Sequence, residues 1–363
     1  MPSAEPLPAE LERILALARE AGSPGAAEAR DILRDLLERL GYDVQVQRFA
    51  FSPRSLDAFP LAGAGLGWLA LLQIPLLLMP ALPPWAALLV WACGLAGLGA
   101  IAAGTALGWG GRTGSREDAT LIARRGDAPV RRWIVAHTDT KAQGHSMAGR
   151  LVAVWVVLVT VAAFTVLAIA RLGGVLEAWP VVVAAGGALA AGVLAGRGRL
   201  SGTTTGARDN GSGLVAALAA AEASQDSGTG LLFTGAEEFG LIGARILGET
   251  RRDLVRGTEV VNFDTLDERG ALSLVSHDGR GRELAARLAP LLVSPRVPVR
   301  LRRLPLGIFV DSYPLARAGA TAVTIGRLDW GTLRLLHTPR DTRDGLSFAT
   351  ARRIGKAIGS MTR

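Results

Sequence analysis

Two stretches, GARDNGSG at residues 206–213 and LLFTGAEEFG at residues 231–240, hold three carboxylates at the ends of predicted secondary-structure elements. Asp209 stands in a glycine-rich turn before an apolar helix, and Glu237 and Glu238 follow a short buried strand. In α/β domains, functional groups gather at the carboxyl edge of the sheet. The two stretches therefore predict an α/β fold with acidic side chains converging at one sheet edge.

The charged parts of the chain around these stretches alternate between strand and helix patterns. Ser23-Pro24 predicts a helix start, and Gly41 predicts its end in a left-handed conformation. The alternation predicts a doubly wound, largely parallel mixed sheet with helices on both faces. Predicted strands cover residues 42–51, 119–123, 133–136, 231–234, 259–263, 272–275, 297–301 and 320–325, and predicted helices include 9–21, 25–40, 282–292, one after Phe239 and one after Thr342.

Four apolar runs interrupt this pattern, at residues 61–79, 85–109, 151–172 and about 176–196. A bilayer core of ~30 Å is crossed by roughly 20 helical residues, so each run is long enough for a transmembrane helix. Short turns join the runs in pairs, which predicts two transmembrane α-hairpins. Buried core helices are the disfavoured alternative, because a globular core seldom needs two such runs joined by a proline-rich turn.

Each hairpin returns the chain to the side of the membrane that it left. One discontinuous α/β domain can therefore form from residues 1–57, 112–150 and 197–363, with hairpins at 58–111 and 151–196. The positive-inside rule predicts a multi-pass cell-membrane protein whose large domain is cytoplasmic. Trp85, Trp109 and Trp179 are predicted interfacial anchors, and the flanks carry Arg54, Arg112, Arg116, Arg150, Arg197 and Arg199 against Arg171 in the far-side turns.

The composition limits the classes of partner. The net charge of +8 comes from arginine, since the only lysines are Lys141 and Lys356. No finger, recognition helix or aromatic-interleaved basic patch predicts nucleic-acid binding, so we expect the arginines to face either anionic lipid or solvent. Cys93 is the single cysteine, which excludes an intramolecular disulfide. Residues 1–20 predict an amphipathic helix in place of a signal peptide.

Seven polar side chains fall at predicted strand or loop ends. Imidazole nitrogen and carboxylate oxygen are the donors that zinc prefers, and two neighbouring ions need a shared carboxylate. Each motif alone has a structural explanation: a satisfied His-x-Asp pair, a glutamate pair beside a helix dipole, or an Asp-Asn-Gly turn. Their occurrence together favours a metal centre. The set is His137, Asp139, Asp209, Glu237, Glu238, Asp264 and His337.

In these motifs the chain resembles metallopeptidase family twenty-eight, the di-zinc exopeptidases that include bacterial leucyl aminopeptidases. The resemblance covers nearly all of the charged part of the chain, in order, and none of the apolar runs. It implies a zinc-exopeptidase fold of the phosphorylase/hydrolase type. The similar segments are SPGAAEARDILRDLLERLGYDVQVQRF, WIVAHTD, GARDNGSG, LLFTGAEEFGLIGA, VVNFDTL, DSYPLARAGATAVTIG and LHTPRDT.

The resemblance also implies roles for single residues. His137, Asp209 and Asp264 would hold one zinc ion, while Asp209, Glu238 and His337 would hold the other. Asp139 would orient the His137 ring. Glu237 would be the general base that takes a proton from the zinc-activated bridging water.

The chain also departs from the family. About 50 residues with a hairpin separate the His137 and Asp209 motifs, where relatives have a short loop. That insertion could displace the first ligand or keep the catalytic loop near the lipid surface. Tyr313 replaces a histidine common in relatives, and His145 and His277 match no ligand position. For Asp311 and Asp341 we expect structural roles in turns and helix caps.

The expected function is a membrane-integrated, zinc-dependent aminopeptidase that removes N-terminal residues from peptides. A first alternative keeps the metal site and changes the reaction, to deacylation of N-acyl amino acids or to glutaminyl cyclisation. A second alternative is an inactive membrane scaffold of the same fold. Neither the preferred residue nor the oligomeric state follows from the sequence.

Overall fold

The computed structural model describes residues 6–106, 114, 116–295, 297–305 and 307–361. The chain divides into two compact units, each assembled from separate segments. The first, called the α/β unit here, comprises Met1–Ser52, Arg112–Ala142 and Gly202–Arg363. The second, called the helical unit, comprises Pro53–Gly111 and Gln143–Ser201.

The α/β unit is built on a mixed sheet of eight strands in the order β1-β2-β4-β3-β5-β8-β6-β7. Its centre, β4-β3-β5-β8, is parallel, and β6 pairs with β7 in parallel, whereas β1, β2 and the β6–β8 pair add antiparallel contacts. This confirms the α/β class and the mixed, largely parallel sheet. The strands are β1 (Asp43–Phe51), β2 (Arg116–Arg124), β3 (Arg132–His137), β4 (Thr229–Thr234), β5 (Glu259–Leu266), β6 (Ala271–Ser276), β7 (Val299–Arg303) and β8 (Thr321–Leu328).

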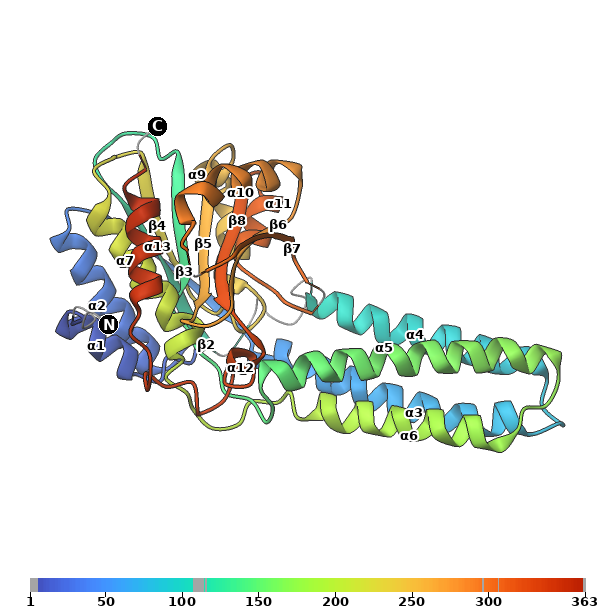
Figure 1. The fold of residues 1–363 in the computed structure, drawn as a ribbon. Helices are drawn as coiled ribbons and strands as arrows, with labels where there is room; N and C mark the ends of the chain where they lie inside the picture. The colour runs from blue at the N-terminus through green and yellow to red at the C-terminus, as the bar shows by residue number, and fades with distance from the viewer. Residues whose placement is uncertain (1–5, 107–113, 115, 296, 306, 362–363) are drawn as a thin grey trace. The chain divides into compact units, whose positions relative to one another are not determined.

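Helices cover both faces of the sheet (Figure 1). Successive side chains of a strand point to opposite faces, and in β3 Ile134 and Ala136 join one core while Trp133 and Val135 join the other. The first core is covered by α1 (Ala9–Ala16), α2 (Pro24–Arg39), α7 (Ser212–Ala223), α10 (Gly279–Leu292) and α13 (Ala349–Gly359), and the second by α8 (Ile242–Thr250), α9 (Arg252–Val255) and α11 (Ser312–Arg317).

The ends of the first two helices show where local sequence was sufficient and where it was not. Ser23 accepts a hydrogen bond from the Ala26 amide as an N-cap, and Gly41 adopts a φ of 82°, as predicted. The helix predicted for residues 9–21 ends at Ala16, because the chain becomes extended at Leu17. That earlier end lets the Arg19 side chain turn into the protein interior, where it is fully buried. The short helices α9, α11 and α12 (Trp330–Leu333) were not predicted.

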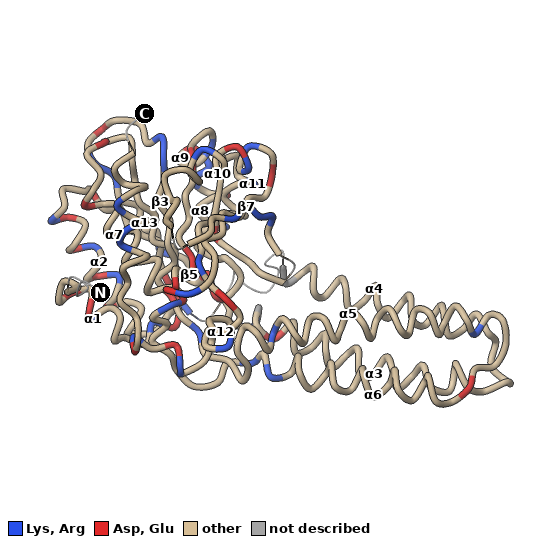
Figure 2. Tube along the Cα trace, viewed as in Figure 1, with Lys and Arg blue, Asp and Glu red and all other residues tan. Residues whose placement is uncertain are grey.

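The helical unit contains four long apolar helices at the predicted positions: α3 (Ala58–Leu78), α4 (Pro84–Ala106), α5 (Met147–Ala170) and α6 (Ala178–Gly196). Their length and composition would allow each to cross a membrane. Figure 2 shows them almost free of charged residues. Trp85 and Trp179 are exposed near helix starts, whereas Trp109 and Arg112, the predicted anchor and flank, lie outside the described residues.

Arg171, directly after α5, is a charged residue buried in the helical unit. Its side chain is buried at the end of α5, where Nε donates to the Leu76 carbonyl at 3.2 Å and Nη2 donates to the carbonyls of Met79 and Leu82 at 3.0 Å each. Helix ends leave carbonyl groups without intrahelical partners. The arginine satisfies such groups around the α3–α4 turn.

Small residues let α3 and α6 approach closely. A Cβ added at Gly63 would lie 2.3 Å from the Ala195 Cβ, and one at Gly192 would lie 3.2 Å from the Gly63 carbonyl oxygen. A Cβ at Gly196 would meet nothing within 4 Å. Only the first glycine of the Gly192-xxx-Gly196 motif therefore contributes to close helix packing.

We predict that Gly63→Leu destabilises the helical unit by ~1–3 kcal/mol, because overpacking forces the two helices apart. Gly97→Leu is the matched control, since Gly97 lies exposed in α4 with no atom within 4 Å of an added Cβ. The melting temperatures of both variants in detergent measure the difference. Equal melting temperatures would show that the close α3–α6 approach does not contribute to stability.

Candidate metal centre

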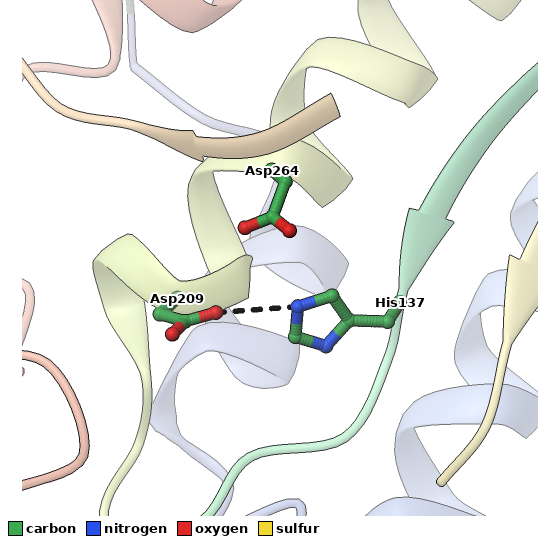
Figure 3. A group of neighbouring side chains, drawn as sticks. All are labelled: His137, Asp209 and Asp264. Atoms are coloured by element: carbon green, nitrogen blue, oxygen red, sulfur yellow. Dashed lines mark ion pairs between the residues drawn. The ribbon is translucent and has the colours of Figure 1, made fainter. Parts of the chain in front are cut away.

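The first group of metal-ligating side chains comprises His137, Asp209 and Asp264 (Figure 3). His137 ends β3, Asp209 lies in the Ala207–Gly211 turn before α7, and Asp264 lies in β5 next to a register shift. His137 Nε2 is 3.2 Å from Asp209 Oδ1. One ligand atom from each of the three residues lies within 4.8 Å of the others. We call this group the first triad.

The second triad comprises Asp209, Glu238 and His337, under the same distance limit. His337 Nε2 is 3.3 Å from Asp209 Oδ2 and 3.4 Å from Glu238 Oε2. All three side chains are buried. Asp209 thus turns one oxygen toward each histidine and is common to both triads. The structure brings together all five residues that the sequence suggested as metal ligands.

Asp139 holds the loop after β3 against the glutamate pair. Its carboxylate accepts hydrogen bonds from the amides of Glu237 at 3.0 Å and Glu238 at 3.1 Å. His137 Nδ1 lies 3.1 Å from the Asp139 carbonyl oxygen and 3.6 Å from its carboxylate. A carbonyl only accepts, so Nδ1 donates to it, and Nε2 faces the Asp209 carboxylate. Asp139 orients the ring mainly through its backbone.

The glutamate pair lies in a turn and not at the mouth of a helix, because α8 begins only at Ile242. Ala236, just before the pair, has a φ of 52°, and Leu241, just after it, has a φ of 61°. The turn leaves the two amides free to donate to Asp139 in place of joining a helix. The expectation that the pair opens a helix was therefore wrong.

Asn210 fixes the distance between Asp209 and β5. Its Nδ2 donates to the Phe263 carbonyl at 2.8 Å, and its Oδ1 accepts from the amides of Gly213 and Thr265 at 3.1 and 3.2 Å. Asn210 directly follows Asp209, and Phe263 and Thr265 flank Asp264. One buried amide side chain therefore connects the backbones of two candidate metal ligands. The sequence suggested only an Asp-Asn-Gly turn here.

Asp341 supports the same turn from the opposite direction. Its carboxylate accepts from the amides of Arg208 at 2.9 Å and Asp209 at 3.1 Å, and it lies 3.5 Å from Arg208 Nη1. Asp341 follows His337 by four residues, so one short loop supplies a ligand and positions another. We had expected a structural role in a turn. In the sequence, only the four-residue spacing between His337 and Asp341 indicated that Asp341 could lie near the metal centre.

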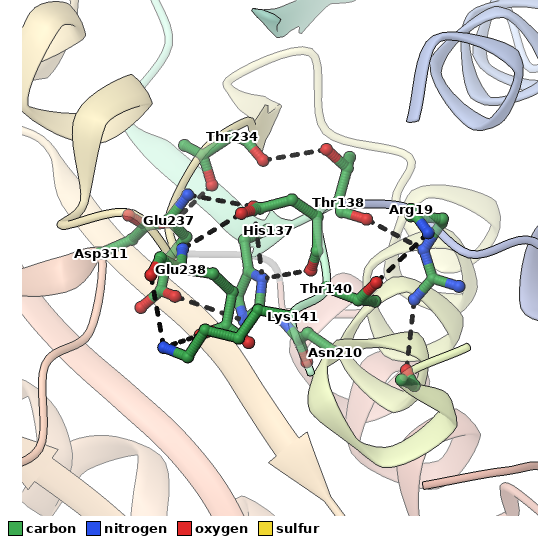
Figure 4. Close-up of polar contacts among 12 residues, drawn as sticks. Arg19, His137, Thr138, Thr140, Lys141, Asn210, Thr234, Glu237, Glu238 and Asp311 are labelled. Carbon is green, nitrogen blue, oxygen red and sulfur yellow. Dashed lines mark hydrogen bonds and ion pairs between the residues drawn. The ribbon is translucent and has the colours of Figure 1, made fainter. Parts of the chain in front are cut away.

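Arg19 holds together the two loops that the second apolar hairpin separates in sequence (Figure 4). Its Nε donates to the Thr138 carbonyl at 2.9 Å, and its guanidinium also donates to the carbonyls of Thr205 at 2.7 Å and Gly206 at 3.2 Å. Burial lowers the pKa of Arg19 to about 10. The inserted hairpin therefore leaves His137 in contact with Asp209.

Two further buried groups near the triads were not predicted as site residues. Lys141 is buried and lies 2.7 Å from Glu238 Oε2, although only its rarity distinguishes it in the sequence. Asp311 is fully buried and accepts a hydrogen bond from Thr234 Oγ1, while its Oδ1 has no hydrogen-bond partner within the described part of the chain. Burial raises the pKa of Asp311 to about 6.

The site holds more buried carboxyl groups than buried positively charged side chains, and this imbalance shifts the pKa values of the carboxyl groups. Burial, followed by the charge of Asp209, raises the pKa of Asp264 to about 7. Burial also raises the pKa of Glu237 well above its usual value, with Glu238 acting in the same direction and His137 opposing. For Glu238, burial is outweighed by the charges of Lys141 and His337, and its pKa is lowered to about 2.

The residues present fit a divalent cation. Glu238 Oε1 and His337 Nδ1 are buried without a hydrogen-bond partner among the described residues, which is costly unless another group satisfies them. Burial, followed by the charge of Asp209, raises the pKa of Asp264, and a cation bound beside it would favour its ionised form. Imidazole nitrogen combined with carboxylate oxygen is a typical donor set for zinc in hydrolytic sites.

The other histidines lie elsewhere. His145 belongs to the helical unit. His277 Nε2 is 2.7 Å from the buried Ser312 hydroxyl, and its ring packs edge-on against Tyr313, with centroids 5.5 Å apart. Neither histidine belongs to either triad. Tyr313 is 37% exposed.

Comparisons with known proteins place the chain among related folds. Solved structures similar to it include an aminopeptidase from Aneurinibacillus sp. strain AM-1 (16% identity, TM-score 0.53, covering 97% of this chain and 91% of that one). They also include a zinc aminopeptidase from Bacillus subtilis (14% identity, TM-score 0.52, covering 98% of this chain and 95% of that one). A glutaminyl cyclase from Porphyromonas gingivalis is similar as well (13% identity, TM-score 0.54, covering 96% of this chain and 93% of that one).

At these identities the structural likeness shows the fold. Comparison with curated protein sequences gives no significant match. Residues 192–362 match the family model "Peptidase family M28", and this range includes Asp209, Glu238, Asp264 and His337. The match covers less than half of the 363-residue chain, so it relates residues 192–362 to peptidase family M28, and the fold of the chain is similar to that of zinc aminopeptidases and glutaminyl cyclases.

Proposed function

We propose that this protein is a membrane-integrated, zinc-dependent aminopeptidase. The observation that carries the proposal is the sharing of Asp209 between two buried triads, each with one histidine and one further carboxylate. Two cations close together need such a bridging carboxylate. The match to peptidase family M28 supports a metal-dependent hydrolase.

In this proposal His137, Asp209 and Asp264 hold one zinc ion, and Asp209, Glu238 and His337 hold the other. Zinc in such a site polarises a carbonyl group and lowers the pKa of water enough for hydrolysis at neutral pH. The chain holds its ligands in place before metal binds, through Asn210, Asp341 and the Asp139 carbonyl. The proposal therefore includes two zinc ions, one in each triad.

Glu237 is the proposed general base. Its carboxylate belongs to neither triad and lies 4.0 Å from His137 Nε2, beside the first triad. Burial raises the pKa of Glu237 well above its usual value, and a carboxylate with a raised pKa is a stronger base. Asp139 fixes the Glu237 backbone through the amide hydrogen bond. Glu237 is therefore placed to accept a proton from water at the site and pass it to the leaving amine.

The four apolar helices would anchor the enzyme as two transmembrane hairpins, at residues 58–111 and 151–196. The catalytic domain, residues 1–57, 112–150 and 197–363, would then face the cytoplasm, as the arginines beside the apolar runs suggest. A basic juxtamembrane flank is also attracted to anionic lipid. Protease accessibility in oriented membrane vesicles tests this topology.

Glutaminyl cyclisation is the second candidate, because cyclase structures resemble this chain as closely as aminopeptidase structures do. Both reactions act on the N-terminal residue of a peptide. The metal-donor residues of the two triads are compatible with both the aminopeptidase and the glutaminyl cyclase reaction.

A substrate panel decides the reaction. We expect zinc-loaded protein in detergent to release the N-terminal residue from peptides with a free amino terminus and to leave N-acylated peptides intact. Release of pyroglutamyl peptide from N-terminal glutamine would favour the cyclase, and hydrolysis of N-acyl amino acids would favour a deacylase. Zinc binding without turnover of any of these substrates would support the inactive scaffold.

A further inference from the structure

The strand β7 lies at one end of the eight-stranded sheet and is rich in arginine. Among the described strands it pairs only with β6, so its other side carries no strand of the described part of the chain. Arg300, Arg302 and Arg303 are exposed, and Leu301 between them is 45% exposed. Figure 2 shows the positive charge along this strand. We call residues Val299–Arg303 the β7 edge.

The three arginines of the β7 edge have no counter-charge. None of them forms an ion pair with a described residue. Other exposed arginines of the α/β unit do, for example Arg39 of α2, whose guanidinium lies 2.7 Å from Glu10. Arg300 and Arg302 also point to the same face of the sheet, ~7 Å apart along the strand, and repel one another. An anionic partner would relieve this repulsion.

Protection of an exposed edge strand does not by itself explain the charge of β7. Natural sheets do place charged side chains on edge strands, because such strands would otherwise pair with other chains. The opposite edge strand, β1, meets this need with one charge of each sign, Asp43 and Arg48. Charges of either sign protect an edge, so three positive charges in one short strand indicate a partner of negative charge.

Aliphatic side chains next to β7 narrow the class of partner. The helix α10 packs against β7, and Leu291 at its end and Val293 just after it are 47% and 66% exposed. Arginine beside exposed aliphatic residues is typical of surfaces that bind at the lipid–water interface. Residues 291–303 include no aromatic side chain on which a nucleic-acid base could stack. A second copy paired through β7 would place arginines opposite arginines, which is destabilising.

We propose that the β7 edge, together with Leu291 and Val293, binds the anionic surface of a lipid bilayer. The arginines contact lipid phosphate and carboxylate groups, and the aliphatic side chains reach the boundary of the acyl chains. The inference rests on the membrane integration of the proposed function, for which the chain has four helices of sufficient length. It adds a second, electrostatic attachment through the α/β unit. Each arginine near an anionic leaflet strengthens binding by ~5-fold, and three by ~100-fold.

Arginine modification of the unmutated, full-length protein tests this. The protein is placed in nanodiscs of phosphatidylcholine alone or of phosphatidylcholine with phosphatidylserine, treated with a dicarbonyl reagent specific for guanidinium groups, and mapped by mass spectrometry. We expect Arg300, Arg302 and Arg303 to react at least ~5-fold more slowly in the anionic nanodiscs. The difference should vanish at ~1 M salt, where the Debye length is ~3 Å. Arg48, on the opposite edge strand, should react equally in both.

Two triple variants with the same change in net charge separate this surface from general electrostatic attraction. One replaces the three arginines of the β7 edge by Gln, and the other replaces Arg13, Arg39 and Arg48, which are exposed elsewhere on the α/β unit. Protein in phosphatidylcholine nanodiscs is mixed with vesicles that contain phosphatidylserine, and bound protein is measured by flotation. We expect the first variant to bind ~100-fold more weakly than the wild type and the second to stay within about threefold. Circular dichroism shows whether each variant is folded.

Equal reactivity of the β7 arginines in the two kinds of nanodisc would overturn the inference. So would failure of the wild type to float with anionic vesicles, or equal weakening by the two triple variants. Protection of these arginines in phosphatidylcholine nanodiscs by added inositol hexakisphosphate or by a single-stranded oligonucleotide would assign the surface to a soluble anion or to nucleic acid. Failure of the protein to enter nanodiscs of either composition is a different result, since it would remove the proposed membrane integration together with this inference.

Discussion

Glu237→Gln is expected to lower kcat by ~10²–10⁴-fold with little change in bound zinc, because proton transfer by a placed side chain contributes about that factor. The amide has nearly the shape of the carboxylate but cannot accept the proton. Glu237 belongs to neither triad, so the metal ligands remain complete. Its backbone contact with Asp139 involves the amide nitrogen and survives the substitution.

The neighbouring residue gives a matched control. Glu238→Gln should reduce zinc occupancy of the second triad, because an amide is a weaker ligand than a carboxylate. Turnover of an aminoacyl substrate and elemental analysis on the same preparations separate the two effects. If Glu237→Gln kept wild-type kcat, or if it lost zinc as Glu238→Gln does, the assignment of the base would be wrong.

Chelation of bound metal should leave a protein that loses stability as the pH rises from about 4 to about 7. The cause is the pKa of Asp264, raised to about 7 by burial and by Asp209. A carboxyl group with a raised folded-state pKa adds stability below its unfolded pKa and loses that contribution as pH rises through the folded value. The pKa values of Asp311 and Asp341, both raised to about 6, act in the same direction.

Glu238 does not cancel this trend. Its pKa is lowered to about 2, so its contribution is present above the unfolded pKa and is lost only as the pH falls toward 2. Between about pH 5 and 7.5 its effect on stability is constant. The slope in that window therefore comes from the groups with raised pKa values.

Zinc should remove most of this loss, because it compensates the ionised carboxylates. Ligand binding to the folded state adds ~4 kcal/mol when the free ligand is at about 1,000 times its Kd. Melting temperatures with and without zinc, at about pH 5 and pH 7.5, measure the effect. We expect a larger zinc shift at the higher pH, and a smaller one in Asp264→Asn, which removes a ligand and the ionisation together. An equal shift at both pH values in the wild type would contradict this account.

Much of the fold follows from local sequence. Ser23 caps α2 and Gly41 ends it, because both effects depend only on neighbouring residues. The buried strands at β3 and β4 appear as continuous apolar runs, as parallel central strands do. The four long helices also follow directly from uninterrupted apolar length.

Other features depended on contacts between distant segments. Ala16 ends α1 five residues earlier than the periodicity suggested, and Arg19 then bridges to Thr138 and Thr205. The turn at Glu237 is shaped by Asp139, about a hundred residues earlier in the chain. No local pattern encodes such partners.

The sequence alone determined which residues were candidates for chemistry, because strand ends, glycine-rich turns and family motifs are local and name His137, Asp209, Glu238, Asp264 and His337. The tertiary structure alone decided how they are held and what charge surrounds them. Asn210 and Asp341 set the position of Asp209 through hydrogen bonds to remote loops. Lys141 reaches Glu238 across 97 residues of sequence, and that contact exists only after folding, because buried charges find their partners by packing and not by spacing along the chain.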